Sequence, residues 1–188
     1  SVALRKVSRI LRVHFKRVRT AAIGPDLSHR RTMVDRVVNS PTVRAAIEEK
    51  ARRSRITPDQ AKHQAEQYVW EIAANYSYSF IIVAEAILAW FWNKIYNGIK
   101  IHHFENFQHS AIGKEVIYVP CHRSHLDYVL LSYLVHENGF VPPHIAAGIN
   151  LNLPVVGSLL RRGGAFFLRR SFRSQKLYAT VFYEYLSM

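Results

Sequence analysis

The segment that most constrains how this chain folds is the run from Val119 to Asp127, because it joins two different patterns of apolar residues. The residues leading into it, Glu115–Val119, are rich in β-branched and aromatic side chains, which predicts a short buried strand. After the run, apolar residues recur at helical spacing, which predicts a helix. His122 therefore lies in a turn and Asp127 in the first helical turns, where a carboxylate can reach back toward an imidazole.

A histidine held by an aspartate is a general base that can take a proton from a hydroxyl near neutral pH. Other interpretations stay open. Ser124 and Asp127 have the spacing of a capping box, which explains the carboxylate without catalysis. His122, His125 and Asp127 suggest a metal site, although no further Cys or acid follows at a metal-binding spacing. Cys121 is the single cysteine and could accept an acyl group, but a cysteine that ends a buried strand is more often a packing residue.

The second half of the chain predicts an α/β domain that follows a helical region. A strand pattern around Ile117 is followed by a helix pattern over Ser124–His136. Two further strand patterns follow, over His144–Gly148 and over Ala165–Leu168. We therefore divide the chain into a basic, mainly helical region, residues 1–99, and the first part of an α/β domain, residues 100–188. Hydrophobic residues make up 49% of the sequence, which is ample for a core.

Two helix starts are visible in the first region. Between Met33 and Lys50 we expect a helix that is interrupted near Ser40-Pro41. Thr57 has the features of an N-cap, because a proline follows it directly and a glutamine stands three residues on. This second helix is expected to continue to about Tyr96.

The apolar second half of that long helix, Tyr78–Trp92, has two interpretations. It is shorter than the roughly 20 apolar residues that span a bilayer, so we expect an ordinary buried helix and no transmembrane span. The alternative is contact with a membrane surface, because the three consecutive aromatic residues from Trp90 to Trp92 suit the lipid headgroup region.

Positive charge is concentrated at the start of the chain. The net charge is +13, and residues 1–56 hold 15 Lys and Arg against 4 acids. A second basic cluster without acids comprises Arg161, Arg162, Arg169, Arg170, Arg173 and Lys176. Such clusters suit nucleic acid, anionic lipid, an acidic carrier protein or phosphate substrates, and charge alone does not choose among them. The single cysteine fits a reducing compartment.

Two motifs then follow in order, about 40 residues apart. His122 to Asp127 has the form His-x4-Asp, and Gly164 to Arg170 joins a glycine, an apolar strand and an arginine. They resemble the first two motifs of the glycerolipid acyltransferases. Gly24–Arg31 and His144–Asn150 resemble the bacterial glycerol-3-phosphate 1-O-acyltransferases of that family in particular. The resemblance covers nearly the whole chain.

The resemblance implies an αβ acyltransferase domain that moves a fatty acyl group from acyl carrier protein or coenzyme A to the sn-1 hydroxyl of glycerol 3-phosphate. His122 would be the base, and Asp127 would fix its tautomer and favour the imidazolium as it forms. Arg170 would bind the phosphate of glycerol 3-phosphate, because a guanidinium grips phosphate bidentately. Arg123 and Gly164 are further substrate-binding candidates. No metal and no cofactor are expected beyond the acyl thioester as co-substrate.

The family's third motif, Phe-x-Glu-Gly-x-Arg, and its fourth, built around a proline, do not occur before Met188. We therefore expect a fragment that starts without an initiator Met or signal peptide and is inactive alone. The resemblance implies a peripheral position on the cytoplasmic face of the bacterial inner membrane, on an anionic surface, and no nucleic acid partner. The alternative is a non-catalytic basic module that binds anionic membrane or nucleic acid through the first 56 residues.

Overall fold

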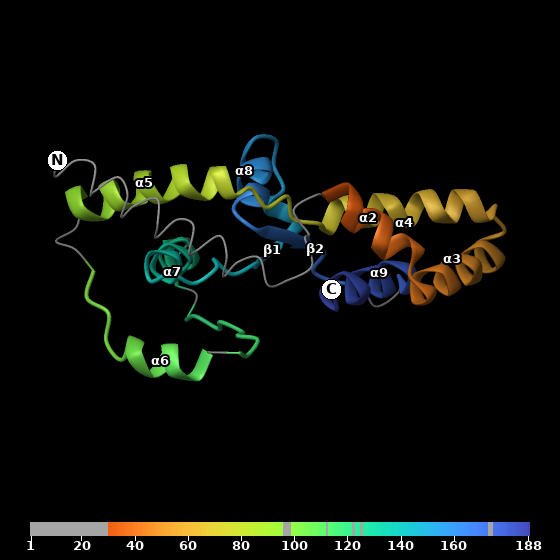
Figure 1. Ribbon diagram of the computed structural model, residues 1–188. Helices are drawn as coiled ribbons and strands as arrows, with labels where there is room; N and C mark the ends of the chain where they lie inside the picture. The colour runs from red at the N-terminus through yellow and green to blue at the C-terminus, as the bar shows by residue number, and fades with distance from the viewer. Residues whose placement is uncertain (1–29, 96–98, 112, 122, 125, 173–174) are drawn as a thin grey trace, which may run out of the picture. The chain divides into compact units, whose positions relative to one another are not determined.

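The computed structural model describes residues 30–95, 99–111, 113–121, 123–124, 126–172 and 175–188. These residues form two compact units, which Figure 1 shows as ribbons. Unit 1 contains the described part of residues 78–143. Unit 2 combines residues 30–77 with the described part of residues 144–188. The predicted domain boundary between residues 99 and 100 stays a prediction.

The first two helices of unit 2 are α2 (Arg30–Asn39) and α3 (Pro41–Ser54). Ser40 separates them and caps α3, because its hydroxyl accepts the N–H of Val43 at 3.2 Å and a proline occupies the first helical position. The predicted interruption near Ser40-Pro41 is confirmed.

Helix α4 (Pro58–Ile72) begins where the sequence predicted. The hydroxyl of Thr57 accepts the N–H of Gln60 at 3.2 Å, and the Gln60 side chain accepts the N–H of Thr57 at 3.0 Å, so the capping box is complete. The predicted continuation to about Tyr96 is wrong, however. The chain leaves the helix after Ile72 and is non-helical over residues 73–77 before the next helix begins.

The end of α4 is set by an arginine that lies far away in the sequence. Arg161, in helix α8 (Val156–Arg162), is only 7% exposed. Its guanidinium donates to the carbonyl oxygens of Ala73 and Glu71 at 2.6 Å each, and to that of Ile72 at 3.4 Å. A cation at this position also complements the negative end of the helix dipole. No sequence pattern near Ile72 indicates this cap. The helix predicted from the sequence was therefore too long.

The sheet of unit 2 consists of the parallel strands β1 (Ile145–Gly148) and β2 (Ala165–Leu168). Ile145 lies opposite Ala165, and Gly148 lies opposite Leu168. The short helix η1 (Ile149–Leu151) and α8 connect the two strands. The strands predicted at His144–Gly148 and Ala165–Leu168 are confirmed, and so is the mixed α/β class with a helical region before it.

The core of unit 2 lies between its helices and strand β2. Helix α9 (Lys176–Leu186) packs against α3 and α4, as Figure 1 shows. Phe167 and Tyr178 are fully buried. The hydroxyl of Tyr185 accepts the N–H of Ala74 at 3.2 Å, which ties α9 to the segment after α4. The first and last stretches of the unit therefore share one core.

Unit 1 contains the helices α5 (Tyr78–Ile95), α6 (Phe104–Ala111) and α7 (Leu126–Glu137). The buried His136 of α7 has its Nδ1 atom 2.9 Å from Oε2 of Glu85 in α5. This polar contact joins α5 to α7.

The predicted strand Glu115–Val119 is wrong. None of these residues is in a strand, and Ile117 and Val119 are each 88% exposed. A strand needs a hydrogen-bonded neighbour, and the two strands in the described part of the chain pair with each other. Cys121 is exposed as well, so its interpretation as a packing residue is also wrong.

The expectation that Tyr78–Trp92 is an ordinary buried helix is wrong too. Only Ile81 and Trp92 of α5 are buried. Val83, Ile87 and Trp90 share one face of α5 and are 59%, 59% and 63% exposed. Among the described helices α5 is the one that is long and apolar enough to cross a membrane, by length and composition.

We predict that Arg161→Met lowers the free energy of unfolding by about 3 kcal/mol, because the carbonyl groups at the end of α4 lose a charged donor. Urea unfolding followed by circular dichroism measures this. Arg162→Met is the matched control, since Arg162 is the exposed neighbour in the same helix, and it should change the stability by less than about 0.5 kcal/mol. Equal losses in the two variants would show that Arg161 does not hold α4.

Candidate active site

The turn of the first motif is held by Asp127. Oδ2 of its carboxylate accepts the N–H groups of Arg123 and Ser124, each at 2.7 Å. Such short bonds to an ionised acceptor are strong, and an acid in the first turn of α7 also complements the helix dipole. His122 and His125 lie outside the described residues, so the predicted contact between His122 and Asp127 stays a prediction.

The capping interpretation of Asp127 is confirmed in one of its two hydrogen bonds. The carboxylate accepts the N–H of Ser124, as in a capping box. The Ser124 hydroxyl instead accepts the N–H of Leu126, at 3.2 Å, and the Ser124 carbonyl accepts the N–H of Asp127. This role fixes where the carboxylate lies, and it is compatible with a second role toward His122.

The remaining polar residues around the first motif are open to solvent. Arg123 and Cys121 are exposed. Within the described ranges no group of three His, Cys, Asp or Glu residues could hold a metal ion. The metal site suggested by the sequence includes His122 and His125 and falls outside those ranges.

The two arginines of the second motif have different surroundings in unit 2. The guanidinium of Arg169 binds both carboxylate oxygens of Glu71 at 2.7 Å and donates to the side-chain oxygen of Gln175 at 2.7 Å. It also lies over the rings of Tyr68 and Tyr178, at 5.1 and 4.7 Å. The hydrogen bonds that Arg169 donates to the Glu71 carboxylate raise the pKa of Arg169. Arg169 is therefore partly exposed, but its guanidinium is engaged by Glu71 and Gln175.

Arg170 is the available arginine of the pair. Strand β2 ends at Leu168, so the alternation of a strand does not extend to Arg169 and Arg170. Even so, Arg169 is partly buried while Arg170 is exposed in a bend. Within the described residues no carboxylate forms an ion pair with Arg170.

Gly164 forms the turn between α8 and β2. Its φ angle is +94°, a conformation that favours glycine, and the residue is buried. Its carbonyl accepts the N–H of Ile145 at 3.1 Å and lies 3.2 Å from Nδ1 of His144. Its own N–H donates to the carbonyl of Arg161 at 3.1 Å. The backbone groups of Gly164 are thus used to join α8, β1 and β2.

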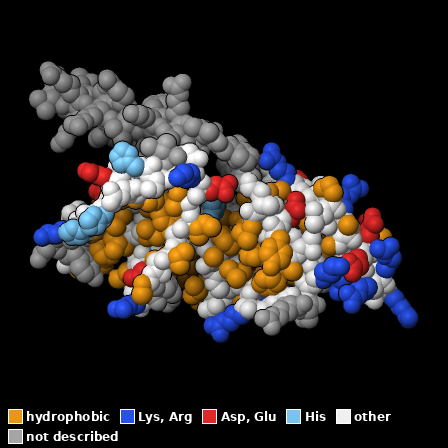
Figure 2. All heavy atoms as spheres, turned by 90° about the horizontal axis from the view of Figure 1, so that it is seen from below, with side chains coloured by type: hydrophobic (Ala, Val, Ile, Leu, Met, Phe, Trp, Pro, Cys, Tyr) orange, Lys and Arg blue, Asp and Glu red, His pale blue; other side chains and the backbone are white. Residues whose placement is uncertain are grey.

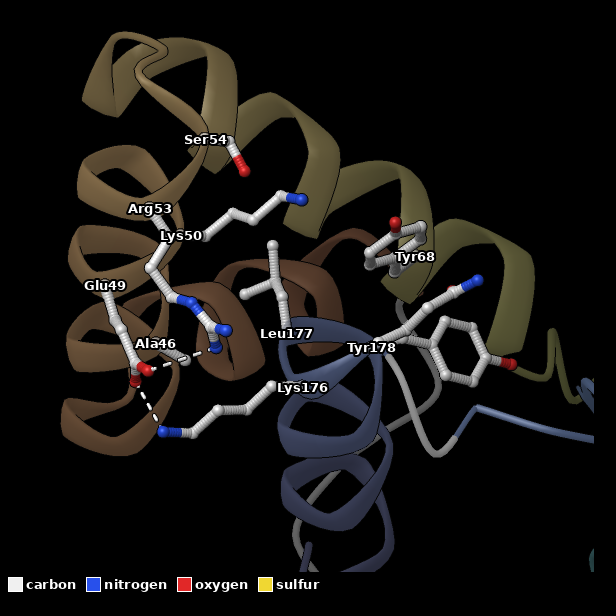
Figure 3. A pocket seen from close by; sticks show the side chains of 10 residues that line it. Ala46, Glu49, Lys50, Arg53, Ser54, Tyr68, Lys176, Leu177 and Tyr178 are labelled. Atoms are coloured by element: carbon white, nitrogen blue, oxygen red, sulfur yellow. Dashed lines mark hydrogen bonds and ion pairs between the residues drawn. The ribbon is translucent and has the colours of Figure 1, made fainter.

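A basic cavity of about 350 Å³ lies between α3 and α9 (Figure 3). Lys50, Arg53 and Lys176 line it, together with Glu49. The Glu49 carboxylate lies 2.5 Å from the Lys176 amine and 3.9 Å from the Arg53 guanidinium. The hydrogen bond from Lys176 is the main reason why the pKa of Glu49 is lowered. Figure 2 shows Lys and Arg side chains, with some carboxylates among them, around the turn between α3 and α4.

The structure places Arg123 and Asp127 in unit 1, and Gly164 and Arg170 in unit 2. Sequence reasoning missed Glu71 as the partner of Arg169, and it gave no partner for Arg161. The signal available for Arg161 and Arg169 was their place in an acid-free basic cluster, which does not reveal a partner about 90 residues away.

A family model described as acyltransferase matches residues 98–187. The chain is 62% identical over 183 residues to a glycerol-3-phosphate acyltransferase of Pseudomonas fluorescens strain SBW25, which covers 97% of the chain and 22% of that protein. It is 60% identical over 185 residues to the protein of the same name from Pseudomonas savastanoi pv. phaseolicola strain 1448A, with 98% and 22% covered. The chain thus spans about a fifth of the length of these relatives. The resemblance predicted from the two motifs is confirmed.

We predict that Asp127→Ala loosens the turn of the first motif. The amides of Arg123 and Ser124 would lose a charged acceptor, and their hydrogen exchange should become about tenfold faster or more. Asp59→Ala is the control, because Asp59 is also an acid in a first helical turn and the change to alanine is the same. Unchanged protection of the two amides in Asp127→Ala would contradict the role of the carboxylate in the turn.

Proposed function

We propose that the protein transfers a fatty acyl group to the sn-1 hydroxyl of glycerol 3-phosphate, giving lysophosphatidate, because residues 98–187 match a family model described as acyltransferase. The observation that carries the proposal is the order of the two motifs, ending at Asp127 and Arg170, inside the matched region. The name of these relatives, glycerol-3-phosphate acyltransferase, supports the same acceptor. A non-catalytic basic module would leave the order of the motifs unexplained.

In the proposed reaction His122 takes the proton of the acceptor hydroxyl while the hydroxyl oxygen attacks the carbonyl carbon of the thioester. An ester C–O bond forms and the C–S bond breaks. The proton passes from the imidazolium to the departing sulfur, so the carrier leaves as a thiol. The hydroxyl itself is the nucleophile, and the chain therefore needs no acyl-enzyme and no attack by Cys121.

Asp127 is proposed to orient His122 and to favour the imidazolium, as carboxylates do in hydrolase triads. Its position supports this role, because two backbone N–H groups hold the carboxylate at the start of α7. Such an anchored anion needs little reorganisation when the imidazole becomes charged.

Arg170 is proposed to bind the phosphate of glycerol 3-phosphate. Its exposure supports this role, and so does the engagement of Arg169 by Glu71. Arg123 would add a second positive charge next to His122. Gly164 would act through the backbone, since its turn sets the start of the strand that leads to Arg170.

The acyl donor is proposed to be a thioester of acyl carrier protein or coenzyme A. The basic cavity lined by Lys50, Arg53 and Lys176 supports an acidic carrier, because opposite charges speed and orient association (Figure 3). The exposed face of α5 supports peripheral contact with an anionic membrane, which in a bacterium would be the cytoplasmic face of the inner membrane. No cofactor is proposed beyond the donor.

We predict that His122→Ala in the intact protein lowers the turnover number by about 10² to 10⁴, because the reaction loses its base. Incorporation of labelled glycerol 3-phosphate into lysophosphatidate measures the rate, and circular dichroism checks the fold. His102→Ala and Cys121→Ser are the controls, and both should keep their activity. A folded His122→Ala variant with near-normal turnover would exclude the general-base role.

We predict that Arg170→Ala raises the KM for glycerol 3-phosphate by about tenfold or more and leaves the KM for the acyl donor unchanged. Arg162→Ala is the matched control, because it removes an exposed arginine from the same basic cluster. Initial rates measured with each substrate varied in turn separate the two constants. An effect confined to the acyl donor would refute the phosphate assignment.

A further inference from the structure

A second cavity of unit 2, of about 400 Å³, lies beside the end of α4 and the turn before α8. Its polar lining comprises Arg30, Asn75, Asn152, Ser158 and Arg161. Neither arginine belongs to the proposed glycerol 3-phosphate site. Two guanidinium groups at one cavity raise the question of which negative charge balances them.

Arg30 is only partly satisfied by the protein. Its Nη2 atom donates to the carbonyl of Trp70, and its guanidinium lies 4.6 Å from the centre of the Trp70 ring. Its Nε atom is buried and has no hydrogen-bond partner among the described residues. A buried donor without a partner is unfavourable, so the protein leaves part of the Arg30 guanidinium uncompensated.

Arg161 adds a second charge to the same place. Its hydrogen bonds go to neutral carbonyl groups, and its guanidinium lies 4.4 Å from the centre of the Phe167 ring. Desolvation and then the charge of Arg30 lower the pKa of Arg161 to about 10, and the opposing effects of Tyr185 and Glu71 are smaller. The two arginines are therefore close enough to repel each other.

The negative charge present does not balance this pair. The end of a helix carries the equivalent of about half an electron charge, against two full positive charges. Glu71 lies in the last turn of α4, but both of its carboxylate oxygens are bound by Arg169. An anion of the size of a phosphate group in the cavity would complete the balance.

The edge of the cavity is apolar and open to solvent. Leu153 and Val155 line it and are 56% and 73% exposed, and the neighbouring Val156 and Leu159 are 45% exposed each. The turn is closely fitted to α8, because a Cβ atom on Gly157 would lie 2.5 Å from the Asn152 side-chain oxygen and 3.0 Å from Asn152 Cα. Aliphatic side chains next to paired arginines match a molecule that has a phosphate and an acyl chain.

We propose that this cavity binds a phosphate-bearing amphiphile, with its phosphate against Arg30 and Arg161 and its chain over Leu153 and Val155. The proposal does not rest on the acyltransferase activity, because it concerns residues outside both motifs. A phosphate group could arrive on a lipid or as a free small anion, and the apolar edge favours the lipid.

Isothermal titration of the intact protein tests the proposal, with dodecyl phosphate below its micelle concentration and inorganic phosphate as probes. An Arg170→Ala background removes the second-motif arginine from the measurement. Arg30→Gln should weaken binding of both probes by about tenfold. Arg31→Gln is the matched control, since it removes the same charge from the exposed next residue, and it should change binding less than about twofold.

Leu153→Asn tests the apolar edge and should weaken binding of dodecyl phosphate alone. Its control is Leu186→Asn, a leucine of similar exposure, 51%, that does not line the cavity. Unchanged binding of dodecyl phosphate by Leu153→Asn would overturn the proposal that the ligand is an amphiphile. The cavity would then be a site for free phosphate. Equal effects of Arg30→Gln and Arg31→Gln, or no binding of either probe, would overturn the site. None of these readouts requires acyl transfer.

Discussion

Unit 2 depends on the hydrogen bonds that Arg161 donates to the last carbonyl groups of α4. They join two stretches that are separated in sequence by the whole of residues 78–143, and they do so at a helix end whose carbonyls have no partner within the helix. The backbone reinforces them, because the N–H groups of Asn75 and Ser77 donate to the carbonyls of Arg161 and Arg162. The end of α4 is thus fixed from α8.

A second link starts from the same helical turn. Glu71 of α4 binds Arg169 at the end of β2, so the loop from α8 through β2 is attached to α4 at both of its ends. A partly buried ion pair stabilises the fold most when its geometry is bidentate and the remaining donors also have partners. Here Gln175 accepts the remaining hydrogen bond from Arg169. The consequence for function is positional, because the residue that follows this anchored arginine is Arg170.

The sequence predicted correctly those elements whose boundaries are determined by neighbouring residues. The helix interruption near Ser40-Pro41, the cap at Thr57 and the strands β1 and β2 were predicted because they follow from residue types within a few positions. The end of α4 was not predictable, since it depends on Arg161. The strand expected at Glu115–Val119 and the burial expected for α5 failed for the same reason, because both require a neighbour that the segment itself does not specify. In the candidate site, the sequence identified the capping carboxylate of Asp127, while the surroundings of His122 lie outside the described residues.

The basic cluster in the second half of the chain contains both paired and exposed charges. Six residues without an acid among them suggested one anion-binding surface. In the structure Arg161, Arg169 and Lys176 each have partners in the helices before them, whereas Arg162 and Arg170 are exposed. Only charges that the fold leaves unbalanced can attract an anionic ligand. The number of residues of this cluster available to an anion is therefore smaller than the six that the sequence suggests. By the same reasoning Arg161 still matters beside Arg30, because carbonyl groups satisfy its donors without cancelling its charge.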